Sequence, residues 1–246
     1  MNHFFITPNQ INDKKITVIG NDVRHIKDVL RMKVGDEATF SDGVNPVEYH
    51  GIITELGNEM ISFDLCYIEK TSHELPARVY LFQGLPKADK MELVIQKAVE
   101  LGVHEIIPIS TNRSIVKLDA KKASAKTKRW NSISEAAAKQ CKRGIVPIIR
   151  EVKSFDEAVK YASEMEIKII PYEMADDVSA TKEIINNIKP EQEIAIFIGP
   201  EGGFSDTEIR LAQENGFIPI TMGKRILRTE TAAFVILSWI MYHLEG

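Results

Sequence analysis

Two glycine-bearing segments near the carboxyl end of the chain carry residue types that could bind a ligand and act on it. The first glycine segment is residues 198–205 (IGPEGGFS) and the second glycine segment is residues 223–233 (GKRILRTETAA). Each follows an apolar run typical of a strand and precedes a run typical of a helix. A glycine turn at such a junction lets a ligand approach the backbone closely and directs free N–H groups at it. Two such turns on neighbouring strands can close on one ligand.

Charged side chains in these segments offer electrostatic and acid–base chemistry. An arginine can stabilise negative charge on a reacting group, and a carboxylate can accept a proton or orient a neighbour. Arg225 and Arg228 are the candidate cations, and Glu201 and Glu230 are the candidate bases. Arg228 and Glu230 could equally form a structural ion pair at a helix start, where a carboxylate is favourable.

The glycine spacing does not match the common nucleotide-binding loops. The chain has no G-x-x-x-x-G-K-[ST] loop, and no G-x-G-x-x-G follows the first strand of the predicted sheet. This disfavours a Walker-type phosphate loop, a Rossmann dinucleotide site and the common methyltransferase fold with an early glycine loop. His, Cys and carboxylate residues do not show metal-ligand spacing, so we expect no metal.

Strand-like and helix-like runs alternate from residue 78 onward, which predicts an α/β domain with a mainly parallel sheet. The continuous apolar run at 194–199 is typical of a strand covered on both faces. Ser205 and Glu208 have the spacing of a capping box, and the alanines at 136–138 are predicted to face inward with Trp130 and Ile133. We expect strands at 79–83, 106–109, 147–149, 167–172, 194–199 and 217–222, and helices at 90–101, 121–141, 155–163, 181–188, 205–215 and 231–244.

The amino-terminal part has a different pattern, with short, partly alternating strands and turn residues between them. We expect strands at 15–19, 37–40, 47–54 and 60–67, one helical piece at 22–31, and a linker at 71–76. The predicted domains are a small barrel at residues 1–72 and an α/β domain at residues 73–246.

The charge is unevenly distributed along the 246 residues, whose net charge is −4. Residues 78–150 hold 15 Lys and Arg against 6 Asp and Glu, a net charge of +9. A basic block within an acidic chain is a candidate footprint for a polyanion such as RNA. The alternative is a solvated helix face around residues 121–129.

Cysteine usage and hydropathy predict the compartment. Cys66 and Cys141 are the only cysteines and lie far apart in the sequence, which favours a reducing setting. We see no export signal, and the most apolar run, residues 232–244, is too short to span a bilayer. We therefore expect a cytoplasmic protein with no membrane partner.

The two glycine segments resemble the signatures of the SPOUT methyltransferase class, and more narrowly those of the ribosomal RNA small subunit methyltransferase E family. Residues 25–31 (HIKDVLR), 87–102 (KADKMELVIQKAVELG) and 130–143 resemble further motifs of that family, so the resemblance covers nearly the whole chain. Val99 stands where the family usually has Thr, and His3 where it often has Arg.

The resemblance implies a PUA-like barrel followed by an α/β domain with a deep trefoil knot, S-adenosylmethionine bound in the knot, and a homodimer. It also implies methyl transfer to N3 of one uridine in 16S rRNA (uridine 1498 in the family), read within the 30S subunit. By resemblance, three loops line the cofactor site, with Ile226 and Leu227 covering the adenine unless they are ordinary core. The implied cofactor residues are Pro171, Tyr172, Glu173, Ile198, Gly199, Pro200, Gly202, Gly203, Met222, Gly223, Ile226 and Leu227.

Uridine N3 carries a proton at neutral pH, so methylation needs a base or cations beside the uracil carbonyls, and Arg143 can join Arg225 and Arg228 in that role. The dimer candidates are Val235, Leu237 and Trp239 on the last predicted helix, unless they belong to the core of one chain. The candidate RNA contacts are Arg31, Lys33, Lys87, Lys90, Arg113, Lys126, Lys128, Arg129 and Arg143.

Three alternatives stay open at this point. The chain could be a SPOUT methyltransferase acting on another rRNA position or on tRNA. It could be a PUA-type RNA-binding protein without catalysis. It could also be an enzyme acting on a small nucleotide with no RNA partner, which the +9 block disfavours.

Overall fold

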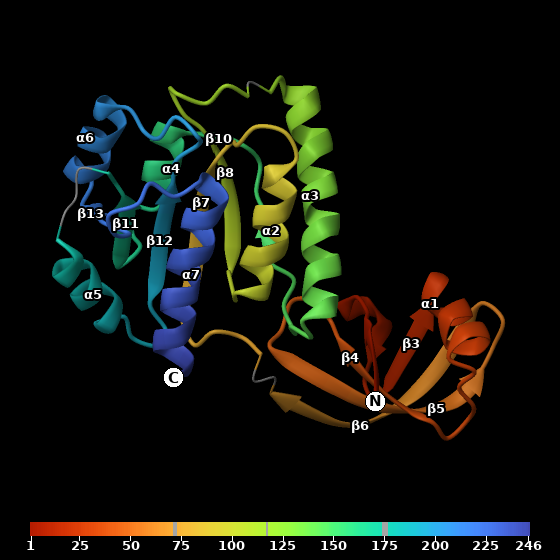
Figure 1. Cartoon of the computed structure of the whole chain (residues 1–246). Coiled ribbons are helices and arrows are strands. Elements are labelled where there is room, and N and C mark those ends of the chain that lie inside the picture. The colour runs from red at the N-terminus through yellow and green to blue at the C-terminus, as the bar shows by residue number, and fades with distance from the viewer. Residues whose placement is uncertain (71–72, 117, 174–176) are drawn as a thin grey trace. The chain divides into compact units, whose positions relative to one another are not determined.

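The structure is a computed structural model that describes residues 1–70, 73–116, 118–173 and 177–246 (Figure 1). The contacts within it divide the chain into two compact units. The first unit comprises Met1–Glu74 and Ala138–Val146, and the second comprises Leu75–Ala137 and Pro147–Gly246. The predicted division into residues 1–72 and 73–246 differs from these units in one respect. Residues 138–146, which the prediction assigns to the second domain, pack with the amino-terminal part.

The first unit is built on a six-stranded sheet in the order β1-β4-β5-β6-β3-β2. Its pairings are antiparallel except that β1 lies parallel to β4. Phe40 and Phe63 are fully buried at its centre and contact each other edge to face. The strands are β1 Asn2–Phe5, β2 Ile11–Asn12, β3 Lys15–Ile19, β4 Glu37–Ser41, β5 Val47–Leu56 and β6 Met60–Lys70.

The predicted helical piece of this unit is present as the α-helix α1 (Asn21–Arg24), followed by a short π-helix over His25–Val29. Strands β1 and β2 were not predicted. They span four and two residues, too short for an alternating pattern to stand out.

Residues 138–146 are fixed to the first unit by a buried ion pair. Arg143 is 3% exposed, and its Nε donates to Glu74 Oε2 at 3.0 Å. Ile145 N donates to the other oxygen of Glu74 at 3.1 Å, and Val146 N donates to Gly43 O at 2.9 Å. The expectation that Arg143 offers its charge to RNA or to uracil is therefore wrong for this structure, because the guanidinium is buried against a carboxylate.

The second unit has a parallel sheet in the order β10-β8-β7-β12-β11-β13, with the short β9 also paired to β8. The predicted α/β class and parallel sheet are confirmed. The strands are β7 Arg78–Gly84, β8 Glu105–Ser110, β9 Ile148–Ile149, β10 Lys153–Ser154, β11 Ile167–Pro171, β12 Glu193–Ile198 and β13 Ile218–Ile220.

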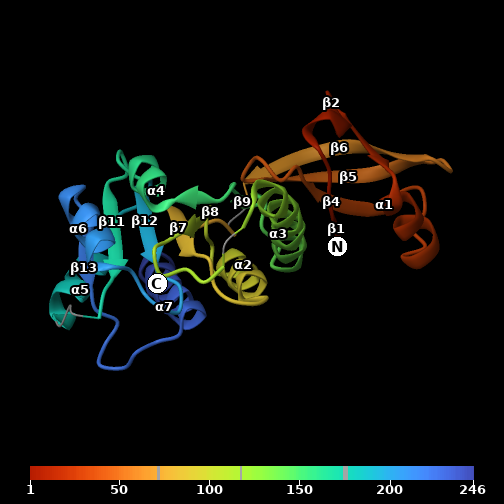
Figure 2. The ribbon, with the colours of Figure 1, turned by 90° about the horizontal axis from the view of Figure 1, so that it is seen from above.

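Helices cover both faces of this sheet (Figure 2). Helices α4 (Phe155–Tyr161) and α6 (Asp206–Glu214) pack on one face around Phe82 and Phe197. Helices α2 (Lys90–Glu100) and α7 (Thr229–Glu245) pack together on the other face. Helices α3 (Ala120–Gln140) and α5 (Val178–Asn186) complete the set.

Several predictions of burial can now be compared with the structure. The residues from Ile194 to Ile198 are at most 2% exposed, as expected for a strand covered on both faces. The predicted capping box opens α6, where Glu208 N donates to Ser205 Oγ at 3.3 Å. Two predictions are wrong. Ala136 is exposed on α3, and Leu237 is fully buried within one chain and cannot line a dimer seam.

Candidate functional site

The three predicted ligand-binding loops leave the sheet from the same edge. In a parallel sheet the carboxyl ends of adjacent strands meet, which is where α/β proteins bind ligands. Pro171 at the end of β11 pairs with Ile220 of β13, and Ile198 at the end of β12 pairs with Gln83 of β7. The structure therefore brings together the loops that begin at Tyr172, Gly199 and Thr221.

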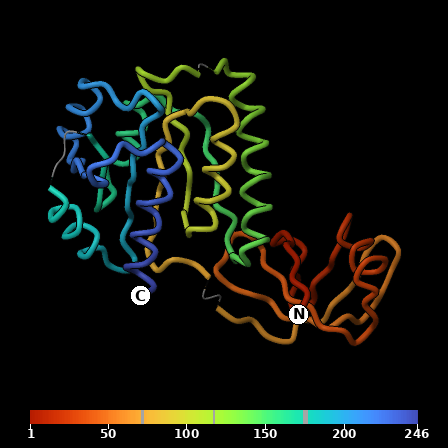
Figure 3. The backbone as a smooth tube through the Cα atoms, in the orientation of Figure 1, coloured from red at the N-terminus to blue at the C-terminus, as the bar shows by residue number. Residues whose placement is uncertain are grey.

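The chain crosses this edge on its way from β13 to α7. Strands β12 and β13 lie on opposite sides of β11, and α7 packs on β12. Residues 221–228 therefore pass β11 on their way to α7, which the blue trace in Figure 3 follows. At the end of this path Thr229 Oγ1 donates to Gly199 O at 2.6 Å. The two glycine segments are thus in direct contact, whereas the knot implied by the resemblance stays a prediction.

Glycine is required at two kinds of position here. A Cβ on Gly84, at the end of β7, would lie 2.6 Å from Pro200 N, so only glycine allows the first glycine segment to approach this strand. Gly203 and Gly223 have φ of +67° and +100°, a region that other residues rarely adopt. Around the latter two, no described atom lies within 4 Å of an added Cβ. The space beside these two Cα atoms is therefore open, although the N–H groups of Gly203 and Gly223 already donate to Pro200 O and Thr221 Oγ1.

The candidate base Glu201 is held as an anion. Its Oε1 accepts hydrogen bonds from Lys87 N at 3.1 Å and from Lys90 Nζ at 3.2 Å. Partial burial would raise the pKa of Glu201, but hydrogen bonds from the backbone N–H groups of Glu201 and Lys87 and from Lys90 outweigh it, and the pKa lies below the ordinary value. A carboxylate of lowered pKa is a poor proton acceptor at neutral pH, so the structure argues against Glu201 as the base.

The second candidate, Glu230, shares the same lysine. Its Oε2 is buried and lies 3.4 Å from Lys90 Nζ, an ion-pair distance without a hydrogen bond. Hydrogen bonding to Glu201, with the charge of Glu230, raises the pKa of Lys90. Lys90 therefore bridges one carboxylate from each glycine segment, and the expectation that it binds an RNA phosphate stays a prediction.

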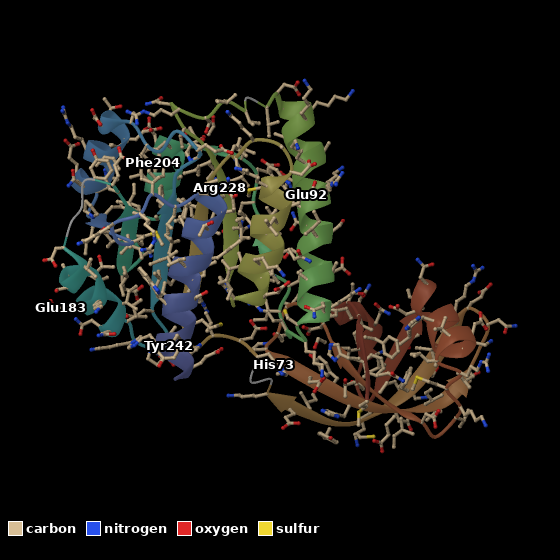
Figure 4. All side chains as sticks on the ribbon, in the orientation of Figure 1. His73, Glu92, Glu183, Phe204, Arg228 and Tyr242 are labelled. Atoms are coloured by element: carbon tan, nitrogen blue, oxygen red, sulfur yellow. The ribbon has the colours of Figure 1, made fainter. Side chains whose placement is uncertain are left out.

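The candidate cations Arg225 and Arg228 are exposed, and neither takes part in an ion pair within the described ranges. Figure 4 labels Arg228 at the start of α7. The alternative interpretation of Arg228 and Glu230 as a structural pair is not supported, since Glu230 faces Lys90 instead. Both guanidinium groups are available to an anionic or carbonyl-bearing ligand.

Among the large apolar residues that the structure describes, Ile226 is the most exposed, at 91%. It lies between the two arginines, three residues after Gly223. The alternative interpretation of Ile226 as ordinary core is wrong. Leu227 beside it is partly exposed. An apolar side chain held in water next to open backbone is suited to cover the flat face of a ligand.

Sequence reasoning missed three residues at this edge. Gln83, Gly84 and Thr229 connect the end of β7 to both glycine segments. A signal was available, because Gln83 is a polar residue in an otherwise apolar strand and is followed at once by glycine. A fully buried amide must find hydrogen-bond partners, which marks such a position for attention.

Apart from Lys90 and Arg143, described above, the predicted RNA contacts fall into three groups. Arg31 and Lys33 are exposed in the first unit, on the turn between the helical piece and β4. Lys87 and Arg113 border the first glycine segment, and Arg113 Nη1 donates to Gly202 O at 3.3 Å. The others lie on α3: Lys128 is exposed, Lys126 lies over the Trp130 ring, and Arg129 is paired with Glu92 at 2.7 Å.

In the ranges that the structure covers, no group of three His, Cys or carboxylate residues could hold a metal ion. None of the helices in those ranges combines the length and apolar character needed to cross a membrane.

Two family models match the chain in agreement with its two parts. Residues 73–241 match an RNA methyltransferase domain, and residues 18–66 match an RNA methyltransferase PUA domain. The second match confirms the expectation of a PUA-like amino-terminal part.

The chain is also similar to named relatives over its full length. It is 35% identical to the ribosomal RNA small subunit methyltransferase E of Bacillus subtilis, covering 100% of this chain and 98% of that one. Its structure resembles that of the ribosomal RNA small subunit methyltransferase E of Neisseria gonorrhoeae bound to S-adenosyl methionine, with a TM-score of 0.81, 30% identity, and coverage of 98% and 97%. A Legionella pneumophila protein solved with bound S-adenosylmethionine gives a TM-score of 0.79 at 31% identity, with coverage of 98% and 96%.

Proposed function

Because the chain belongs to the ribosomal RNA small subunit methyltransferase E family, we propose that it transfers a methyl group from S-adenosylmethionine to N3 of one uridine in 16S rRNA. The observation that carries this proposal is the meeting of the two glycine segments at the carboxyl edge of the sheet, with two exposed arginines beside them. Similarity over the full length to an enzyme of that name supports it.

The residues at this edge fit S-adenosylmethionine. The N–H groups of Gly203 and Gly223 already donate to Pro200 O and Thr221 Oγ1, so the carbonyl groups of these glycines are the ones that can hydrogen-bond to the adenine and ribose, and the space beside both Cα atoms lets a ligand approach. Gln83 Oε1 is a buried acceptor to which no described residue donates. Ile226 can cover the adenine. We therefore assign the cofactor to the loops at 171–173, 198–203 and 222–227. When bound, the cofactor supplies an electrophilic methyl group on a sulfonium.

The protein itself must stabilise the form of the uridine that has lost its N3 proton. Arg228 and Arg225, placed beside the uracil carbonyls, stabilise the negative charge that spreads onto those oxygens. Glu230 is the better candidate to accept or direct the proton, because Glu201 is committed to Lys87 and Lys90. Holding the uridine next to the methyl donor contributes further rate.

The proposal extends to partners and compartment. The substrate is 16S rRNA read within the 30S subunit in the cytoplasm, with Lys87, Arg113 and Lys128 as phosphate contacts. The enzyme acts as a homodimer. Within each chain, the carboxyl-terminal segment 221–233 completes a trefoil knot. In support of a dimer, Val235 and Trp239 are partly exposed on α7, and Tyr242 on the same helix is 80% exposed.

The test is methyl transfer from labelled S-adenosylmethionine, with free 16S rRNA and isolated 30S subunits as separate substrates, followed by nucleoside analysis. Label in 3-methyluridine from 30S subunits is the expected result. Label in another nucleoside, or in tRNA, would instead support a related methyltransferase. Cofactor binding without label in any RNA would indicate an RNA-binding protein without catalysis.

A further inference from the structure

Two buried side chains, from Gln83 and Thr229, link the glycine segments to the end of β7. Gln83 Nε2 donates to Thr229 Oγ1 at 2.8 Å and to Gly84 O at 2.9 Å. Thr229 Oγ1 in turn donates to Gly199 O at 2.6 Å. Gln83 is fully buried and Thr229 is 5% exposed. Together they form a short chain of hydrogen bonds between largely buried groups.

The direction of donation in this chain is determined by the groups themselves. A threonine hydroxyl has one proton, and because Thr229 gives it to the Gly199 carbonyl, it must accept from Gln83. Both amide protons of Gln83 are then in use, which fixes the amide orientation. Bonds linked in this way in a buried setting polarise and strengthen one another.

The acceptor of the chain is the peptide carbonyl on which the first glycine segment turns. Gly199 has no Cβ and can adopt many backbone conformations. The peptide plane that carries its carbonyl also carries the nitrogen of Pro200, so fixing one fixes the other. A Cβ on Gly199 would lie 3.1 Å from the Cα of Gly203. The orientation of this one carbonyl therefore sets the path of the whole turn.

We propose that Thr229, held by Gln83, is a positioning residue for the cofactor. Its hydroxyl selects the conformation of the Gly199 peptide and so pre-organises the first glycine segment to receive S-adenosylmethionine. Neither side chain has to touch the methyl group. The inference rests on the proposed function, because it takes S-adenosylmethionine to be the ligand.

The experiment measures S-adenosylmethionine affinity by calorimetry for the wild-type chain and three variants. Thr229→Val removes the hydroxyl at nearly constant shape and should raise Kd by at least about tenfold, because the turn is no longer pre-organised. Thr229→Ser restores the donor and should stay within about threefold of the wild type. The matched control is Ser134→Ala, which removes a buried hydroxyl that donates to Pro147 O at 2.6 Å on α3, away from the edge. Its Kd should not change.

Steady-state kinetics separate positioning from a merely structural role. Thr229→Val should raise KM for S-adenosylmethionine while kcat at saturating cofactor stays within about threefold, since the lost interaction concerns binding. If Thr229→Val does not fold, Thr229→Ala, which keeps a good helix former at this position, takes its place.

Three outcomes are decisive. Unchanged affinity of Thr229→Val in a wild-type protein that binds S-adenosylmethionine would overturn the positioning role and leave the proposed function intact. An equal loss in Ser134→Ala would also overturn it, because general destabilisation would then explain the effect. A wild-type chain that binds no S-adenosylmethionine would overturn the proposed function and this inference together.

Discussion

The two glycine segments differ in how firmly the surrounding fold holds them. The first glycine segment is firmly held although Glu201 and Gly202 are exposed, because Gly84 packs against Pro200 and hydrogen bonds from Lys87 and Lys90 hold Glu201. The second glycine segment is exposed between Gly223 and Thr229, where each residue except Leu227 is open to solvent.

This difference suggests that the two glycine segments have different roles in binding a ligand. A firmly held turn presents a preformed surface to a ligand, whereas a loosely held, exposed stretch can contribute cations and an apolar cover once a ligand is bound. Substitutions in the first glycine segment should therefore lower stability and cofactor affinity together. Substitutions in the exposed residues 224–228 of the second should change binding or catalysis and leave stability unaltered. The four predictions that follow test this separation.

The largest effect is expected from Gly84→Ala. The new Cβ would lie 2.6 Å from Pro200 N and would push the first glycine segment off its strand. We expect the free energy of unfolding to fall by about 2–3 kcal/mol and S-adenosylmethionine affinity to fall with it, as measured by urea denaturation and calorimetry. Ala158→Val, which overpacks the α4 face of the same sheet, should match the loss of stability without the loss of affinity. Normal affinity in Gly84→Ala would show that the contact with Gly84 does not hold the first glycine segment in its ligand-binding conformation.

Arg228→Ala comes next and should act on the chemical step. Removal of one cation from the reacting oxygens should lower kcat by about 100-fold, with KM for S-adenosylmethionine and Tm nearly unchanged. The side chain makes no capping bond at the start of α7, so helix stability should not suffer. Lys224→Ala, another exposed cation of the same segment, is the control and should retain most of the activity. Full kcat in Arg228→Ala would remove this residue from the mechanism.

Ile226→Ala should have a smaller effect, confined to binding. The side chain is 91% exposed, so its truncation should change the free energy of unfolding by less than about 0.5 kcal/mol. Loss of its apolar area against the adenine should raise Kd for S-adenosylmethionine by about fivefold. Ile218→Ala on β13, which truncates a 46% exposed isoleucine outside the glycine segments, should leave Kd unaltered. Equal affinity of the two variants would show that Ile226 does not cover the cofactor.

The smallest effect concerns Glu201 and pH. Its pKa in the folded chain lies below the ordinary value of 4.5, so its ionised form stabilises the fold fully above that pH. The contribution disappears as pH falls through the folded pKa. The free energy of unfolding of the wild type should therefore exceed that of Glu201→Gln by about 0.5 kcal/mol at pH 7. This gap in stability should close as the pH falls below about 4.5. Glu214→Gln, at an exposed carboxylate, should show no such gap, and a gap of constant size from pH 7 to pH 3 would refute the assignment.

The sequence was most informative where the relevant partners are local. The continuous apolar run ending at Ile198 predicts a doubly covered strand because its own residues carry the signal, and Ser205 and Glu208 form their capping box within one turn. The glycine segments were found for the same reason, since each strand-to-helix turn lies within a dozen residues.

The missed features join residues that are distant in the chain. Gln83 meets Thr229 across 146 positions, and Lys90 meets Glu201 across 111. No periodicity encodes such pairs, because they depend on which strands become neighbours in the sheet. Arg143 illustrates the opposite error, since a positive charge in a basic block looks available until the fold places Glu74 against it.

The membership of residues 138–146 in the first unit has a consequence for how the protein is made. The first 74 residues do not complete that unit. Glu74 has its ion-pair partner only once Arg143 has been synthesised, and the Gly43 carbonyl has its hydrogen-bond donor only once Val146 has been synthesised. At a synthesis rate of roughly 5–20 residues per second, the intervening stretch delays completion by roughly 4–14 seconds. During that interval the nascent barrel exposes an unpaired carboxylate and open backbone groups, and a fragment ending at residue 74 would stay in that unfinished state permanently.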